Sequence, residues 1–385
     1  MAARSLVLAV AVLLAAVARA QDAASCLECH SLPDQELPFK DGASRSVTID
    51  PKAWEGSVHG QSGLDCTACH TEHSEYPHAE VKEESARAYA IAQNKACESC
   101  HEDQVKQFAD GVHYAMLHSG NTKAAVCSDC HDPHAGRRLT DPDKGTLLPE
   151  ARQGIPLTCA KCHSGIYEQY KGSAHGAALL GHNNHDVPTC IDCHGVHQIR
   201  DPRTARFRVN SPMICASCHT DAAKMKRYGL STAVLKTYVA DFHGSTVTLF
   251  QRTHPDQQTN KPVCYDCHGV HDIPHTRDPQ KGIRTKANLL RTCQQCHPTA
   301  TANFPDAWMS HFIPDRERAP LVFWVGWLYR ILIPVTVGGM LLFVGMDFAR
   351  RRADRRRAAR AERPAEEPNE AEAPEEPKEP EEPQA

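Results

Sequence analysis

The chain has 385 residues, of which 18 are cysteine and 24 histidine, and only 6% are aromatic. Every cysteine belongs to one of nine Cys-x-x-Cys-His pentapeptides. This excludes a disulfide-stapled scaffold, because disulfides do not require a histidine after each cysteine pair. The formal net charge of −4 gives no indication of a nucleic-acid partner.

The first twenty residues have the features of a secretory signal peptide. Arg4 provides a positive start, and residues 6–17 form an apolar run that is short for a membrane span. Ala18 and Ala20 fit a small-residue cleavage site. We therefore expect residues 1–20 to be removed and the mature chain to begin at Gln21. An uncleaved membrane anchor is the alternative.

The nine pentapeptides predict covalent haem. Two thiols at this spacing reach both vinyl groups of one porphyrin, and the following histidine binds the iron as proximal ligand. In a zinc site two such cysteine pairs would bind one metal ion together. A redox dithiol would account for a single pentapeptide. With no cysteine left over, the sequence favours nine covalently attached c-type haems.

The predicted thioether-forming cysteines are Cys26, Cys29, Cys66, Cys69, Cys97, Cys100, Cys127, Cys130, Cys159, Cys162, Cys190, Cys193, Cys215, Cys218, Cys264, Cys267, Cys293 and Cys296. The predicted proximal iron ligands are His30, His70, His101, His131, His163, His194, His219, His268 and His297.

Two recurring contexts mark candidate distal iron ligands among the other histidines. In the first, an aromatic residue lies five positions before the histidine, as Trp54 does before His59. In the second, the histidine follows an even-numbered pentapeptide by three residues, as His73 does. With His311, which follows Trp308 by three residues, the nine candidates are His59, His73, His113, His134, His175, His197, His243, His271 and His311.

These contexts define a repeat that contains two pentapeptides and two candidate distal histidines. It recurs over residues 26–73, 97–134, 159–197 and 215–271, and residues 293–311 form a half-repeat. The count of nine candidates for nine irons predicts bis-histidine coordination. Histidines outside the repeat are His78, His118, His182, His185, His254 and His275, of which His118, His182 and His254 are the preferred replacements. Methionines, the other usual distal ligands, occur in no recurring context.

The segments between pentapeptides predict a fold with little regular structure. They are rich in Pro, Gly, Asp and Lys and read as loops, with short helices expected over residues 85–95, 101–109 and 220–239 and only weak strand signals. We expect mostly irregular loops and short α-helices packed around stacked haems, with little β-structure. The haems would then supply the apolar core that the sparse Leu, Ile, Val and Phe residues do not.

A second apolar run, residues 321–346, is long enough to cross a membrane. Trp324, Trp327 and Tyr329 near its start resemble an aromatic belt, and Pro334 predicts a kink. Its one charge, Arg330, either extends to the outer interface or pairs with a quinone head group or haem propionate. We predict a C-terminal transmembrane α-helix over residues 319–347.

The sequence after this run predicts the orientation. Eight arginines between positions 350 and 363 place this end in the cytoplasm by the positive-inside rule. Residues 364–385 hold nine glutamates and six prolines, so we expect a disordered tail, with a binding segment as the alternative. Residues 348–385 would be the cytoplasmic tail, and residues 21–318 the periplasmic haem region of a bacterial inner-membrane protein.

With these features the chain resembles the membrane-anchored periplasmic multihaem c-type cytochromes, whose haems are typically bis-histidine. The resemblance implies an electron carrier of anaerobic respiration, which relays electrons between the quinone pool and periplasmic cytochromes or reductases. Its expected membrane partner is a quinol-oxidising or b-type cytochrome subunit. Nine haems and a C-terminal anchor depart from the four- and five-haem quinol dehydrogenases, which are usually anchored at the N-terminus.

A multihaem reductase is the alternative function. Reduction of nitrite, hydroxylamine or a sulfur oxyanion would need one haem with an open distal face. No Cys-x-x-Cys-Lys sequence occurs, and the histidines outnumber the iron positions to be filled, so the carrier is favoured.

Overall fold

The computed structural model describes residues 23–275, 278–307, 311 and 313–361. The predicted signal peptide and the acidic tail therefore lie outside the described residues. The chain divides into two compact units, Met1–Phe312 and Ile313–Ala385, which are considered separately.

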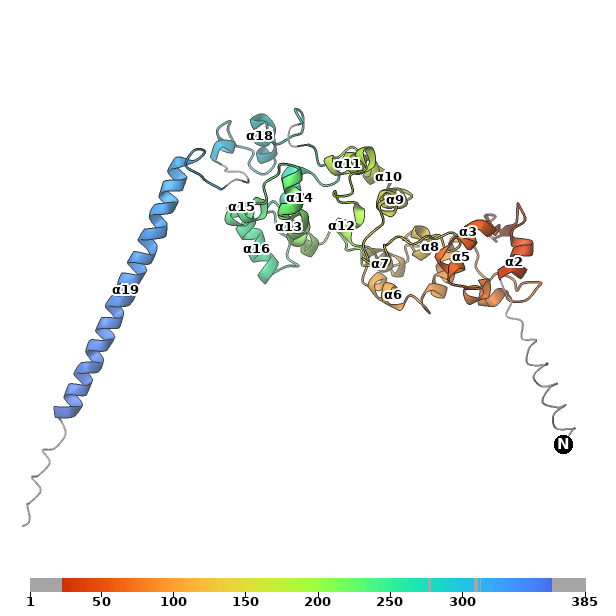
Figure 1. Cartoon of the computed structure of the whole chain (residues 1–385), viewed down its shortest axis with the longest axis horizontal. Coiled ribbons are helices and arrows are strands. Elements are labelled where there is room, and N and C mark those ends of the chain that lie inside the picture. Colours follow the sequence, from red (N-terminus) through yellow and green to blue (C-terminus); the bar gives the residue numbers. More distant parts are fainter. Residues whose placement is uncertain (1–22, 276–277, 308–310, 312, 362–385) are drawn as a thin grey trace, which may run out of the picture. The chain divides into compact units, whose positions relative to one another are not determined.

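Short helices joined by long irregular segments dominate the first unit (Figure 1). Its helices in the N-terminal half are α2 Ala23–His30, α3 Pro51–Glu55, α4 Val58–Gln61, α5 Ala86–Gln93, α6 Glu102–Ala109, α7 Val112–His118, α8 Cys127–Cys130 and α9 Pro149–Ala160. Those that follow are α10 Ser164–Lys171, α11 Ala174–His182, α12 Cys190–His194, α13 Ala205–His219, α14 Ala222–Arg227, α15 Val234–Ala240, α16 Phe242–Thr253, α17 Cys264–His268 and α18 Lys286–Gln294. Single 3-10 turns are η1 Cys66–Ala68, η2 Thr71–His73, η3 Asn94–Cys97 and η4 Phe304–Ala307.

The expected scarcity of β-structure is confirmed in the described residues. Strands β1 Glu36–Pro38 and β2 Ser44–Ser46 form one antiparallel pair, with Leu37 opposite Arg45. The helices expected over residues 85–95 and 101–109 correspond to α5 and α6. The helical segment expected over residues 220–239 is divided into α14 and α15, because the chain turns between them with Gly229 at a φ of 62°.

The apolar core of the first unit is small. A cluster of buried side chains joins Val209, Val247 and Val263, with Phe250 and Tyr265 packed against it. These residues come from α13, α16, α17 and the residue before α17. Side chains thus fill only part of the interior of the described region, as the sequence composition predicts.

The second unit contains one long helix, α19 Pro320–Ala361, of 42 residues. At about 1.5 Å per residue this length exceeds what the hydrocarbon core of a bilayer requires. Its most apolar window has a mean hydropathy of 2.0 and no buried residues, so by length and composition it is a possible membrane span among the described residues. Pro334 lies within the continuous helix.

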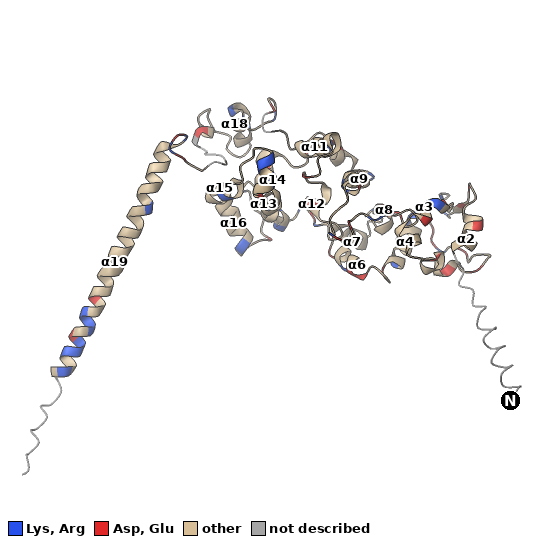
Figure 2. Cartoon of the chain, in the orientation of Figure 1, with Lys and Arg blue, Asp and Glu red and all other residues tan. Residues whose placement is uncertain are grey.

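The helix continues through the arginines that we had assigned to the tail. Figure 2 shows Lys and Arg residues gathered towards the C-terminal end of α19. There Arg351 pairs with Asp347 at 2.7 Å. The helix extends to Ala361, so it continues beyond residue 347, where we expect the membrane-spanning segment to end.

Candidate haem-binding sites

Each pentapeptide closes on itself through a backbone hydrogen bond. The histidine N–H donates to the carbonyl of the first cysteine four residues earlier, at 2.9 Å for His70 on Cys66 and 2.8 Å for His297 on Cys293. This single helical turn holds both cysteines and the histidine in one local unit. A helix or 3-10 turn ends within each odd-numbered pentapeptide. The fourth, sixth and eighth pentapeptides instead form the short helices α8, α12 and α17.

The aromatic-led histidines occupy the same position in four helices. His59, His113, His175 and His243 are each the second residue of their helix, namely α4, α7, α11 and α16. The preceding helix carries the aromatic residue. Ser57 and Ser173 cap two of these helices and are buried, and each hydroxyl accepts the backbone N–H three residues on at 3.0 Å. The sequence therefore presents each imidazole from a fixed helix start.

In the described part of the chain, each of the nine pentapeptide histidines faces another histidine. Ring-centre distances are all between 6.0 and 6.4 Å. The pairs are His30–His78, His70–His134, His101–His59, His131–His197, His163–His113, His194–His271, His219–His175, His268–His311 and His297–His243. His70 has two such neighbours, His134 at 6.0 Å and 21° and His73 at 6.2 Å and 39°.

This separation fits a metal held between the two rings. A bond between a metal and an imidazole nitrogen is about 2 Å long, and the nitrogen lies about 1 Å from its ring centre. Two imidazoles on opposite sides of one metal therefore have centres about 6 Å apart. Eight of the nine candidate distal histidines each face a different pentapeptide histidine at this separation. The ninth, His73, lies 6.2 Å from His70, which also faces His134, and the histidine that faces His30 is His78.

The pairs follow a simple register that crosses between repeats. Each aromatic-led histidine follows one pentapeptide in the sequence and faces the histidine of the pentapeptide two further along. His113, for example, follows the third pentapeptide and faces His163 of the fifth. Each second-context histidine after His73 follows one even-numbered pentapeptide and faces the histidine of the previous even-numbered pentapeptide. His197, for example, follows the sixth pentapeptide and faces His131 of the fourth. Histidines of one repeat thus face pentapeptide histidines of a neighbouring repeat.

Backbone hydrogen bonds hold neighbouring repeats together beside these histidines. The N–H of Val58, just before His59, donates to the carbonyl of Gly136, two residues after His134, at 2.8 Å. The equivalent bonds join Val112 to Ile199 at 2.7 Å and Ala174 to Ile273 at 2.8 Å. This recurring contact fixes the aromatic-led histidine of one repeat beside the second-context histidine of the next.

Several rings are oriented by a hydrogen bond at Nδ1. His30 Nδ1 lies 3.0 Å from the Val47 carbonyl, His59 Nδ1 3.1 Å from that of Pro133, and His78 Nδ1 2.8 Å from that of Glu75. A proton on Nδ1 that donates to a carbonyl leaves Nε2 as the metal-binding atom.

Burial favours the neutral, metal-binding form of these imidazoles. Burial, with a smaller effect from neighbouring histidines, lowers the pKa of His70, His175 and His268 to about 4. Burial also lowers the pKa of His134 and His197. Neutral imidazole is the form that coordinates a metal, so the surroundings suit ligand positions.

The cysteines of successive pentapeptides lie close together in chain order. First cysteines influence each other in pairs. Burial and the neighbouring Cys26 thiol raise the pKa of Cys66 to about 11, and the Cys127 thiol lowers the pKa of Cys97 to about 6. Cys159 and Cys190 form such a pair, as do Cys215 and Cys264. Burial raises the pKa of the second cysteine of each even-numbered pentapeptide, and a nearby thiol of the next odd-numbered pentapeptide contributes to this rise. These pairs are Cys69 with Cys97, Cys130 with Cys162, Cys193 with Cys215, and Cys267 with Cys293.

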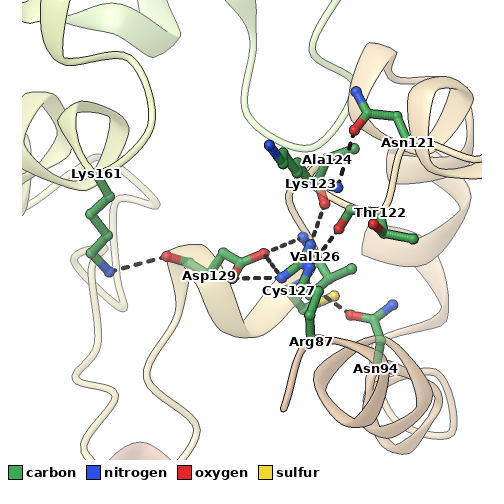
Figure 3. Close-up of polar contacts among 10 residues, drawn as sticks. All are labelled: Arg87, Asn94, Asn121, Thr122, Lys123, Ala124, Val126, Cys127, Asp129 and Lys161. Carbon is green, nitrogen blue, oxygen red and sulfur yellow. Dashed lines mark hydrogen bonds and ion pairs between the residues drawn. The ribbon is translucent and has the colours of Figure 1, made fainter. Parts of the chain in front are cut away.

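A recurring Arg–Asp pair, which the sequence analysis missed, holds three of the even-numbered pentapeptides. Arg87 donates to both carboxylate oxygens of Asp129 at 3.0 and 2.9 Å, and also to the carbonyls of Thr122 and Ala124 (Figure 3). Asp129 in turn accepts the Val126 N–H at 2.7 Å. The equivalent ion pairs are Arg152–Asp192 at 2.7 Å and Arg208–Asp266 at 2.9 Å.

The first of these pairs belongs to a network that links three pentapeptides. The Asn94 side-chain oxygen, three residues before the third motif, accepts the Cys127 N–H at 2.9 Å (Figure 3). Lys161, inside the fifth motif, donates to the Asp129 carbonyl at 3.0 Å. The signal that was overlooked is the aspartate directly before the second cysteine, which motifs four, six and eight share.

The aromatic residue of the first context also has a structural role. The Tyr170 hydroxyl donates to the carbonyl of Pro188 at 2.8 Å, and the Tyr238 hydroxyl to that of Pro262 at 2.9 Å. Both carbonyls lie two residues before an even-numbered pentapeptide. The tyrosines therefore connect the aromatic-bearing helix to the following motif.

The remaining histidines take other positions. His118 stacks on Tyr114 with ring centres 3.8 Å apart, and His254 Nδ1 lies 2.9 Å from the Thr253 hydroxyl. Across the described residues no ring pair joins His118, His182, His185, His254 or His275 to a pentapeptide histidine. None of these five histidines therefore faces His30, and the histidine that does so is His78. Trp308, the aromatic expected before His311, lies outside the described residues.

Comparison with known proteins gives one informative similarity. The multiheme cytochrome MtrA of Shewanella baltica is 27% identical in an alignment 239 residues long, which covers 52% of this chain and 65% of the relative. The match thus covers slightly less than two thirds of the length of that protein. No family model matches the chain, and no solved structure matches it. The similarity and the pentapeptides together support a multihaem c-type cytochrome with covalently bound haem and a role in electron transfer.

Proposed function

We propose that the chain carries nine c-type haems, each with two histidine ligands, and that it relays electrons without acting on a substrate. The observation that carries this proposal is the set of nine facing imidazole pairs at 6.0 to 6.4 Å. The pentapeptide cysteines would hold the porphyrins by thioether bonds, and the haem irons would supply one-electron redox chemistry.

The protein has three tasks in this function. Its paired histidines would both bind the haem iron and so leave no position for a small ligand. Its buried surroundings keep those imidazoles neutral, as the lowered pKa of His70 indicates. Its interlocked repeats place successive pentapeptides next to one another, which gives electrons a path in chain order.

The proposed location follows from the two ends of the chain. The haem region would lie in the periplasm, and α19 would cross the inner membrane with its arginines on the cytoplasmic side. The expected partners are a quinol-oxidising or b-type subunit in the membrane and soluble periplasmic cytochromes or reductases. The ninth pentapeptide ends at His297, 24 positions before the apolar run, and is the proposed port towards the membrane.

Mass and spectroscopy of the full chain test the proposal. We expect an intact mass equal to the mature chain plus nine haems, an entirely low-spin spectrum, and no carbon monoxide binding on reduction. His197→Ala should create one high-spin haem that binds carbon monoxide. A high-spin haem in the unmodified protein would instead support the reductase.

A further inference from the structure

The first pentapeptide has two additional histidines beside it. His78 faces His30 with ring centres 6.0 Å apart and planes inclined by 26°. His73 lies edge-on to His78, with ring centres 5.4 Å apart and an angle of 68°. Burial lowers the pKa of His73, and the nearby His30 contributes to this shift. Two imidazoles therefore lie close to the position opposite His30.

His73 has no other ligand position to fill in the described structure. It occupies the same place after the second motif as His134, His197 and His271 occupy after theirs. Those three histidines each face the histidine of the even-numbered motif before their own. In the described residues no even-numbered motif precedes the second, so His73 has no equivalent partner. Its ring centre is 6.2 Å from His70, but His70 already faces His134 at 6.0 Å and 21°.

The two histidines differ in how they are held. His78 is exposed, and its Nδ1 lies 2.8 Å from the Glu75 carbonyl in its own loop. His73 is half-buried at the end of η2, and its Nδ1 is buried without a hydrogen-bond partner in the described part of the chain. A buried imidazole nitrogen without a partner carries a desolvation cost. The ring of His73 would therefore lose no hydrogen bond at Nδ1 by rotating towards another position.

We propose that the first haem has two interchangeable distal ligands, His78 in the arrangement seen here and His73 in its place when His78 is withdrawn. This inference rests on the proposed bis-histidine coordination. The exchange breaks one iron–nitrogen bond and forms another between the same atom types. One imidazole ligand takes the place of another, so the exchange requires no oxidant or reductant. The end of the haem series would thus stay closed to small ligands while its distal ligand changes.

The test compares four variants of the full-length protein by spin state and by carbon monoxide binding to the reduced form. They are His73→Ala, His78→Ala, the double variant of both, and His271→Ala as the matched control. His271 has the same sequence context as His73 but faces His194 at 6.0 Å. Intact mass verifies that each variant retains its full set of haems.

We expect both single variants at the first motif to remain low-spin and to bind no carbon monoxide. The double variant and the control should each convert one haem in nine to the high-spin, carbon-monoxide-binding form. A high-spin haem in His78→Ala alone, with the control behaving as expected, would overturn the exchange but leave the coordination scheme intact. A low-spin double variant would exclude both histidines as ligands. A low-spin control would overturn the scheme itself and this inference with it.

Discussion

Gly176 packs directly against the backbone carbonyl of Tyr170, at the turn that leads from α10 into α11. A Cβ atom at this position would overlap the carbonyl, and the same packing recurs at Gly60 and Gly244. Each of these glycines directly follows an aromatic-led histidine. The glycine therefore allows the aromatic-bearing helix and the histidine-bearing helix to approach closely enough to fix the imidazole.

Replacing this glycine should destabilise the protein. We expect Gly176→Ala to cost about 1–3 kcal/mol, because the backbone of Tyr170 must move to admit the new methyl group. Thermal unfolding of the full haem-loaded protein measures the effect. Gly181→Ala is the matched control, since Gly181 lies in the same helix with no atom within 4 Å of the added Cβ. Equal unfolding temperatures for the two variants would contradict the packing argument.

The Arg–Asp pairs predict a second effect on stability. Arg208→Met leaves the half-buried Asp266 carboxylate with the Val263 N–H as donor but without its ion-pair partner, and leaves the Lys261 carbonyl without the arginine donor, so we expect a loss of about 1–3 kcal/mol. Arg206→Met is the control on the same helix, because Arg206 pairs with Asp256 at an exposed site. An exposed pair contributes only about 0–1 kcal/mol.

Thermal unfolding with a count of bound haem distinguishes the two variants. The Arg208 variant should unfold at the lower temperature, with the same haem count in the native protein. If Arg206→Met were as destabilising as Arg208→Met, the recurring pair would have no special role in holding the eighth motif.

The sequence repeat identified most of the facing histidines but not their partners. The contexts around His113 and His197 are local patterns, so they are visible in the sequence. Their partners, His163 and His131, belong to other repeats, and only the folded backbone brings them together. Period and spacing therefore give a list of ligand candidates without the connections between them.

His73 and His78 show the limit of the repeat argument. His73 has the sequence context of a ligand, but the register leaves it without an even-numbered motif to face. His78 has no recurring context and comes opposite His30 through the loop after η2. The arrangement at the end of a repeat series depends on such local structure, which the pattern of the inner repeats does not contain.

The orientation of α19 yields a prediction on topology. The arginines at its C-terminal end should be cytoplasmic, because positive residues are retained on that side. Protease added to spheroplasts should digest the haem region and leave a membrane fragment that retains Arg350 to Arg360. An epitope placed after residue 385 provides the control and should be cleaved only after the membrane is permeabilised. Cleavage of that epitope in intact spheroplasts would reverse the orientation.

The crossed pairing of the imidazoles predicts which haem each distal histidine serves. His113 follows the third pentapeptide in sequence but faces His163 of the fifth at 6.3 Å. His113→Ala should therefore convert one haem to a high-spin form that binds carbon monoxide on reduction, and this haem should be the fifth. Removal of individual haems through their cysteines identifies it, because a haem that is absent cannot become high-spin.

Two backgrounds separate the crossed pairing from a local one. In a chain without the fifth haem, made by Cys159→Ala with Cys162→Ala, His113→Ala should add no carbon-monoxide-binding haem. In a chain without the third haem, made by Cys97→Ala with Cys100→Ala, the same change should still add one. Intact mass confirms eight haems in each background. The reverse result would assign His113 to the third haem, in its own repeat, and would contradict the interlocked arrangement on which the proposed electron path depends.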